Sequence, residues 1–201
     1  MNYEEALAYY PAVVAAGDVA AFVAPLDSES RDDILRAAWQ TVVAAADPRL
    51  VPLVAGVQQH LPSLPLFGAA MEAAWSETAT GLNAFAAALT PDVADFLRLG
   101  LGTISTALET FADPGTHLPA AVEWFRHAGP ALVSATLHGR TYVDRLGELA
   151  ERAGVREPGF SVPRWIFWRS RLHGLARAGS QPAREGVKVM MRYDPQIAAH
   201  F

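Results

Sequence analysis

Glu123 and His127 lie one helical turn apart in the segment EWFRH. Residues four apart on a helix project from the same face, so this carboxylate and imidazole could ligate one metal ion. His138 lies in the next predicted helix and could add a further nitrogen ligand. One hypothesis is therefore a helical-bundle enzyme, metal-dependent in one version, with Glu123, His127 and His138 as candidate catalytic residues and Glu123 and His127 as candidate metal ligands.

Other features of this region weaken the catalytic hypothesis. A glutamate and a histidine at this spacing also form ordinary surface ion pairs, and the Glu-x-x-His motif of di-iron bundles is absent. Ser134 precedes His138 by four residues, but no Gly-x-Ser-x-Gly turn surrounds it. The glycines of RLGLGT at 98–103 follow no predicted strand and so indicate no dinucleotide site. Whether the protein is an enzyme, and with which cofactor, stays open from the sequence.

The C-terminal quarter of the chain differs from the rest in charge. Residues 1–155 carry a net charge of −10, whereas residues 156–201 carry +5. We therefore expect an acidic helical body, 1–155, and a basic helical segment, 156–201, packed together as one domain. Within the basic segment, residues 163–178 have the periodicity of an amphipathic helix. Its predicted core face consists of Trp165, Trp168, Leu172, Leu175 and Ala176.

The remaining faces of the basic segment carry the candidate binding residues. Phe167 falls outside the core face, near Arg164 and Arg171, so we expect an exposed ring flanked by guanidinium groups. A last helix is predicted over 182–193, where basic residues recur every four positions. The candidate residues for binding a ligand or partner are Arg164, Phe167, Arg171, Arg184, Lys188 and Arg192.

Four interpretations of the basic segment are open. Its arginines could bind an acidic protein partner, or a carboxylate or phosphate ligand. Cations with aromatic rings could also hold nucleic acid or lie on anionic lipid, but a net charge of −5 for the whole chain makes nucleic acid a poor fit. The simplest alternative is that the segment folds onto the acidic body and pairs its arginines there.

The composition is that of a globular protein without disulfides. Hydrophobic residues make up 51% of the 201 residues, and the absence of cysteine excludes thiol chemistry and cysteine-ligated metals. No apolar run approaches the roughly 20 residues of a membrane span, and the N-terminus lacks the pattern of a signal peptide. We therefore expect a cytoplasmic protein, and the excess of arginine over lysine is typical of a GC-rich bacterial genome.

Helix-forming patterns fill the chain. Strand signals are nearly absent, while caps and stops recur at short intervals, as at Asp47-Pro48 and Asp113-Pro114. The sequence predicts an all-α fold, a compact multi-helix bundle of about nine mostly short helices, with helical segments over 64–89 and 140–153. The similar phrases at 46–54 and 112–122 leave a short helical-repeat solenoid as the alternative.

These observations favour a helical binding protein. One version binds an apolar small molecule in the bundle, because aromatic residues numerous enough to line a pocket include Tyr10, Phe22, Trp39 and Phe67. The other version binds a protein partner through the basic aromatic segment, and an exposed Phe167 would also favour a homo-oligomer. The helical-bundle enzyme is the alternative.

Overall fold

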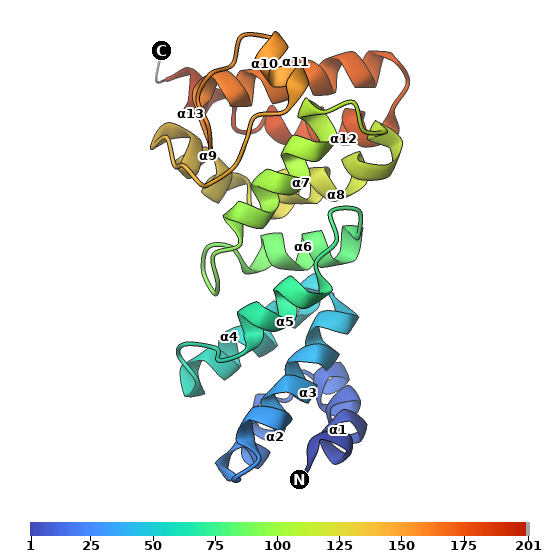
Figure 1. Ribbon diagram of the computed structural model, residues 1–201, viewed down its shortest axis with the longest axis vertical. Coiled ribbons are helices and arrows are strands. Elements are labelled where there is room, and N and C mark those ends of the chain that lie inside the picture. The colour runs from blue at the N-terminus through green and yellow to red at the C-terminus, as the bar shows by residue number, and fades with distance from the viewer. Residues whose placement is uncertain (200–201) are drawn as a thin grey trace. The chain divides into compact units, whose positions relative to one another are not determined.

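A computed structural model describes residues 1–199, in which helices are the only regular elements (Figure 1). Within these residues there are thirteen α-helices, two short 3-10 helices and no β-strand. The predicted all-α class is therefore confirmed. The number of helices exceeds the expected nine because several are very short, among them α10 (Glu148–Arg152) and α13 (Asp194–Ala198).

The chain divides into two compact units at the junction of Ser76 and Glu77. We call Met1–Ser76 the N-terminal unit and the described chain from Glu77 onward the C-terminal unit. The division lies far from residue 155, where the charge of the sequence changes, and the C-terminal unit contains both acidic and basic segments. The formal charge is −6 for residues 1–76 and +1 for residues 77–201, so the excess negative charge belongs to the N-terminal unit.

The N-terminal unit is built around α3 (Arg31–Ala45), which contacts α1 (Tyr3–Ala16) and α5 (Phe67–Ala74). Asn2 begins α1 with a capping box, and Gly17 ends it in the left-handed conformation that glycine adopts without strain. The other helices of this unit are short, namely α2 (Val19–Val23), η1 (Ala24–Asp27), η2 (Pro48–Leu50) and α4 (Val51–His60).

A ladder of aromatic rings fills the core of the N-terminal unit. The rings of Tyr10, Phe22, Trp39 and Phe67 follow one another with centroids 5.0, 4.9 and 4.8 Å apart, and all four residues are buried. Two polar atoms on the ladder have backbone partners, because the Tyr10 hydroxyl donates to the Phe22 carbonyl at 2.9 Å and Trp39 Nε1 donates to the Pro65 carbonyl at 2.8 Å. The four rings pack directly on one another and form the core of this unit.

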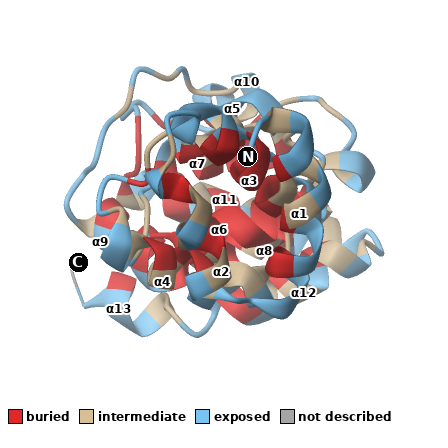
Figure 2. Ribbon diagram, turned by 90° about the horizontal axis from the view of Figure 1, so that it is seen from below, coloured by how far each residue is buried: buried red, intermediate tan, exposed pale blue. Residues whose placement is uncertain are grey.

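The C-terminal unit has α8 (Pro114–His127) at the centre of its contacts. This helix packs on α6 (Thr80–Leu89), α7 (Leu97–Glu109) and α12 (Gln181–Met190). The longest helix of the unit, α11 (Val162–Arg177), packs on α7, α12 and α9 (Gly129–Leu137). Figure 2 colours buried positions red, and buried residues lie in the middle of α8 and along one side of α11. The basic segment is therefore attached to the rest of its unit by a shared core.

Two predicted helical segments differ from the structure. Residues 64–89 form two helices, α5 and α6, separated at the boundary between the units. The helix expected over 140–153 is reduced to α10, because the backbone of 140–147 is bonded elsewhere. The Arg140 carbonyl accepts the Phe160 N–H at 2.7 Å, and the Gly147 N–H donates to Glu109 Oε2 at 2.9 Å. Among the described residues, no helix combines the length and apolar character that a membrane crossing requires.

Candidate functional site

Arg164 is fully buried in the C-terminal unit, so its assignment as an exposed binding residue is corrected. Its Nε and Nη2 atoms donate to Glu109 at 2.5 and 3.0 Å, and Nη1 donates to Asp144 at 2.9 Å. Burial tends to lower the pKa of this guanidinium, but the bonds to Glu109 and Asp144 hold the pKa above its ordinary value. Arg164 is an interior structural residue with no surface to offer a partner.

Glu109 is the centre of this buried network. Besides the two bonds from Arg164, its carboxylate accepts Trp168 Nε1 at 2.6 Å, the Ser105 hydroxyl at 2.9 Å and the Gly147 N–H at 2.9 Å. A buried carboxylate requires such donors because water does not solvate it. The network therefore fixes α7, α11 and the connection 140–147 to one another, and it has no vacant donor on Arg164 with which to bind a ligand.

The other faces of α11 are partly as predicted. Trp165, Trp168 and Leu172 of the predicted core face are fully buried, whereas Leu175 and Ala176 are half-buried. The candidates Phe167 and Arg171 are also half-buried, so Phe167 presents less surface than the sequence predicts. The exposed ring flanked by guanidinium groups is therefore not present at Phe167.

The three basic candidates of the last long helix are exposed as expected. Arg184 and Lys188 lie along one side of α12, and Arg192 follows its C-terminal end. Lys188 Nζ lies 3.1 Å from Glu185 Oε1, while Arg184 and Arg192 have no acidic partner among the described residues. We call these three residues the α12 stripe. The opposite side of the helix is buried at Ala183, Gly186, Val189 and Met190.

A groove of about 450 Å³ lies beside the outer face of α11, and we call it the α11 groove. It combines cationic side chains with two large apolar ones, since Ile166 is 37% exposed and Met191 is 57% exposed. One acidic residue lies within it, Asp194, whose Oδ1 is 3.0 Å from Arg169 Nη1. The lining residues are Ile166, Arg169, Ser170, His173, Arg177, Met191 and Asp194.

The basic segment uses few of its charges to pair with the body of the protein. Among the described residues, only Arg164 of its eight cations forms ion pairs with acidic residues that precede position 156. Arg169 and Lys188 pair with Asp194 and Glu185, which belong to the segment itself. The segment is thus held by apolar contacts and by Arg164. The α12 stripe and the α11 groove, together the cationic face, keep much of their charge uncompensated.

The structure does not assemble Glu123, His127 and His138 into one site. Glu123 is bonded to Arg126, and its Oε2 lies 3.2 Å from His127 Nε2, as in an ordinary ion pair. His138 Nδ1 lies 2.7 Å from the Ser134 carbonyl oxygen and 3.5 Å from the Ser134 hydroxyl, on an exposed surface. Within residues 1–199 there is no group of three or more histidine or acidic side chains placed to hold a metal ion.

The electrostatics of Glu123 agree with a role in ion pairing. Burial tends to raise the pKa of this carboxyl, but hydrogen bonds from His127 and Arg126 outweigh burial and lower the pKa below its ordinary value. Glu123 therefore stays ionised between two basic neighbours. A general acid at neutral pH would require a raised pKa instead.

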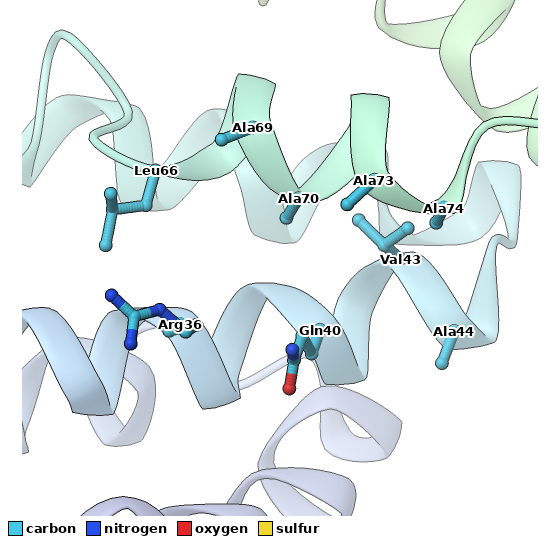
Figure 3. A pocket seen from close by; sticks show the side chains of 9 residues that line it. All are labelled: Arg36, Gln40, Val43, Ala44, Leu66, Ala69, Ala70, Ala73 and Ala74. Atoms are coloured by element: carbon cyan, nitrogen blue, oxygen red, sulfur yellow. The ribbon is translucent and has the colours of Figure 1, made fainter.

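A second groove, of about 400 Å³, lies in the N-terminal unit between α3 and α5 (Figure 3). Its polar residues are Arg36, which points toward Leu66, and Gln40, which points away from α5. Gln40 Oε1 accepts the Tyr3 hydroxyl at 2.5 Å, which accounts for that direction. The rest of the lining is apolar and consists of Val43, Ala44, Leu66, Ala69, Ala70, Ala73 and Ala74.

The fold defines the class of this protein as an all-α helical protein. The chain belongs to a family described as "Protein of unknown function (DUF3632)", whose profile matches residues 32–172 and so includes parts of both units. No curated protein and no solved structure matches the chain. The two grooves and the cationic face therefore have to be interpreted from their own chemistry.

Sequence reasoning did not single out the apolar residues of the α11 groove. Ile166 lies next to the predicted core face of α11, and Met191 falls within the predicted last helix, 182–193. Both are exposed because α11 and α12 already bury Trp165, Trp168 and Met190 against the unit. The available signal was the interval of four between Arg169, His173 and Arg177, which places three basic side chains on one face of a helix.

Proposed function

We propose that this protein is a non-enzymatic binding protein whose cationic face binds an acidic segment of a protein partner. The observation that carries the proposal is the exposure of Arg177, Arg184 and Arg192, which have no acidic partner among the described residues. The planar guanidinium group matches a carboxylate through two parallel hydrogen bonds. An acidic segment of a partner would supply these arginines of the C-terminal unit with the carboxylates that they lack.

A protein segment fits this face better than a polyphosphate or a lipid surface. The exposed Ile166 and Met191 offer apolar contact beside the cations, which a nucleic-acid backbone does not use. Asp194 and Glu185 interrupt the row of basic residues, so this face is not the continuous cationic track that binds a phosphate backbone.

The catalytic alternative receives less support from the geometry. Glu123 is already bonded to Arg126 and lies against His127, and His138 bonds to the backbone of its own helix. Replacing His127 with alanine is therefore expected to affect stability alone. A binding function requires no chemistry beyond the charges and apolar contacts described for the cationic face.

The proposal is tested with a labelled synthetic peptide that forms an amphipathic helix, with glutamate at every fourth position and leucine on the adjoining face. We expect saturable binding by fluorescence anisotropy that weakens as salt is added. The double variant Arg184→Gln/Arg192→Gln should bind about three- to tenfold more weakly, since each exposed ion pair contributes up to about 1 kcal/mol.

The matched control is Arg31→Gln/Arg145→Gln, which removes the same charge from exposed positions outside the cationic face. It should bind the peptide like the wild-type protein. Equal weakening in both double variants would show that only net charge matters and would overturn the proposal. So would tighter binding to a DNA duplex or to phosphatidylserine vesicles than to the peptide.

The α3–α5 groove supports a second candidate function, the binding of an apolar small molecule. Its volume of about 400 Å³ lies within the usual range of ligand sites, and its lining is mostly alanine. Native mass spectrometry of freshly purified protein would detect a retained organic ligand. With the dye 1-anilinonaphthalene-8-sulfonate as probe, Ala73→Leu should reduce binding, whereas Ala12→Leu, at an exposed position of α1, should not. Equal dye binding by both variants would exclude this groove.

A further inference from the structure

We infer that Asp194 takes the place of a partner carboxylate in the α11 groove, and that the partner is an acidic amphipathic helix that displaces Asp194 from Arg169. The inference rests on the proposed function of the cationic face and identifies the chemistry of its partner. It also gives the protein an internal competitor for its own binding surface.

The ion pair between Asp194 and Arg169 is suited to exchange. The closest approach is 3.0 Å between Oδ1 and Nη1, and the side chains are 28% and 38% exposed. Asp194 Oδ1 is itself buried yet makes no hydrogen bond, because it lies close to Arg169 Nη1 without being aligned with it. A partly solvated, poorly aligned pair contributes little, so a better-aligned carboxylate can replace it.

The spacing of basic residues on α11 specifies a helical partner. Arg169, His173 and Arg177 recur at intervals of four, which on a helix with a rise of about 1.5 Å per residue corresponds to about 6 Å between neighbours. A partner helix with a carboxylate at every fourth position has the same spacing, so its carboxylates can face these basic residues one by one. Ile166 and Met191 line the same groove, so they would contact an apolar residue on the adjoining face of that helix.

Helix α13 can lose the Asp194 contact without being detached from the unit. Ile197 is buried, and α13 contacts α9. Gly129 at the start of α9 lies so close to the Tyr193 ring that an added Cβ would be 2.2 Å from it. These contacts hold both ends of α13 independently of the carboxylate. Displacement therefore requires a change at the Asp194 side chain and not the unfolding of the helix.

The test compares two variants that remove one negative charge each from the cationic face. Asp194→Asn should tighten binding of the glutamate–leucine peptide about three- to fivefold, as expected for loss of a competing exposed ion pair. Glu185→Gln, which frees Lys188 outside the groove, is the matched control and should change binding less. In the background of Arg169→Gln, Asp194→Asn should have no effect, because the group for which they compete is gone.

The outcomes separate the inference from the proposed function. Equal tightening by Asp194→Asn and Glu185→Gln, or an undiminished effect of Asp194→Asn without Arg169, would overturn the inference and leave the cationic face as a binding surface. Failure of the wild-type protein and of every variant to bind the peptide would overturn both. A peptide with serine in place of leucine should bind more weakly, because it loses the contact with Ile166 and Met191. Equal affinity of the two peptides would refute this contact. Circular dichroism confirms that each variant is folded.

Discussion

Arg164 and Glu109 form a two-point salt bridge inside the C-terminal unit, with donor–acceptor distances of 2.5 and 3.0 Å and no exposure of either side chain. The two residues are 55 positions apart in the chain. The salt bridge therefore joins the end of α7 to the beginning of α11. Together with the bond from Arg164 to Asp144, it ties the basic segment to acidic residues of the body.

Removing one partner of this pair should be severe. We expect Arg164→Met to lower the free energy of unfolding by about 3–5 kcal/mol, because Glu109 would be left buried and charged without its counterion. Urea denaturation followed by circular dichroism measures the loss, with the exposed Arg145→Met as control. The double variant Arg164→Met/Glu109→Met should recover part of the stability. A cost of less than about 1 kcal/mol for Arg164→Met would contradict a strict need for the pair.

Two glycines in helices should respond oppositely to alanine. A Cβ at Gly100 in α7 would lie 2.5 Å from the buried Trp124 ring, so Gly100→Ala should cost about 1–3 kcal/mol through overpacking. Gly174 in α11 has no atom within 4 Å of an added Cβ, so Gly174→Ala should gain up to about 1 kcal/mol from helix propensity. Thermal unfolding of the two variants measures both. Similar effects would show that α7 and α8 are not closely packed at Gly100.

Glu123 should contribute to stability in a pH-dependent manner. Its pKa is lowered in the folded protein, so the contribution is full above the unfolded pKa, near 4.3, and is lost as the pH falls through the folded value. Glu123→Gln should therefore be less stable than the wild-type protein at neutral pH, and the difference should shrink in acid. Urea midpoints measured from pH 7 to pH 3 test this. A difference that stays constant over this range would exclude Glu123 as its source.

Tyr10 should make the N-terminal unit sensitive to alkali. Burial, with a smaller contribution from Tyr9, raises the pKa of its hydroxyl far above the ordinary value of about 10. Its stabilising contribution is full below pH 10 and is lost as the pH rises toward the folded pKa. Tyr10→Phe should cost about 1 kcal/mol at neutral pH and less above pH 10. Tyr3→Phe, which removes a hydroxyl bonded to the Gln40 side chain at the edge of the unit, is the control. Identical alkaline profiles of the two variants would count against this assignment.

Much of the local structure could be predicted from the sequence. The interval between Trp165, Trp168 and Leu172 identified the buried face of α11, because residues three and four apart share one side of a helix. The same rule identified the exposed side of α12. It failed for 140–153, where Gly147 bonds to Glu109 and the backbone is held in a connection that local propensity does not describe.

The candidate site shows the same limit. The α12 stripe follows from one helix alone, so its exposure could be predicted. Arg164 is an arginine in the same basic segment as Arg184 and Arg192. It is nevertheless buried, because Glu109 lies opposite it in the fold. Nothing in the sequence singles out Asp194 near the C-terminus. Its position beside Arg169 follows from the packing of α13.

The sequence by itself determined the all-α class, the division of charge along the chain and the faces of individual helices, since each depends on residues within a few turns of one another. Only the tertiary structure decided which cations are neutralised. A charge is compensated by whatever lies within a few ångströms of it, and for Arg164 that neighbour is 55 residues away. Arg177, Arg184 and Arg192 are exposed and have no acidic partner among the described residues, because the fold brings no such side chain close to them.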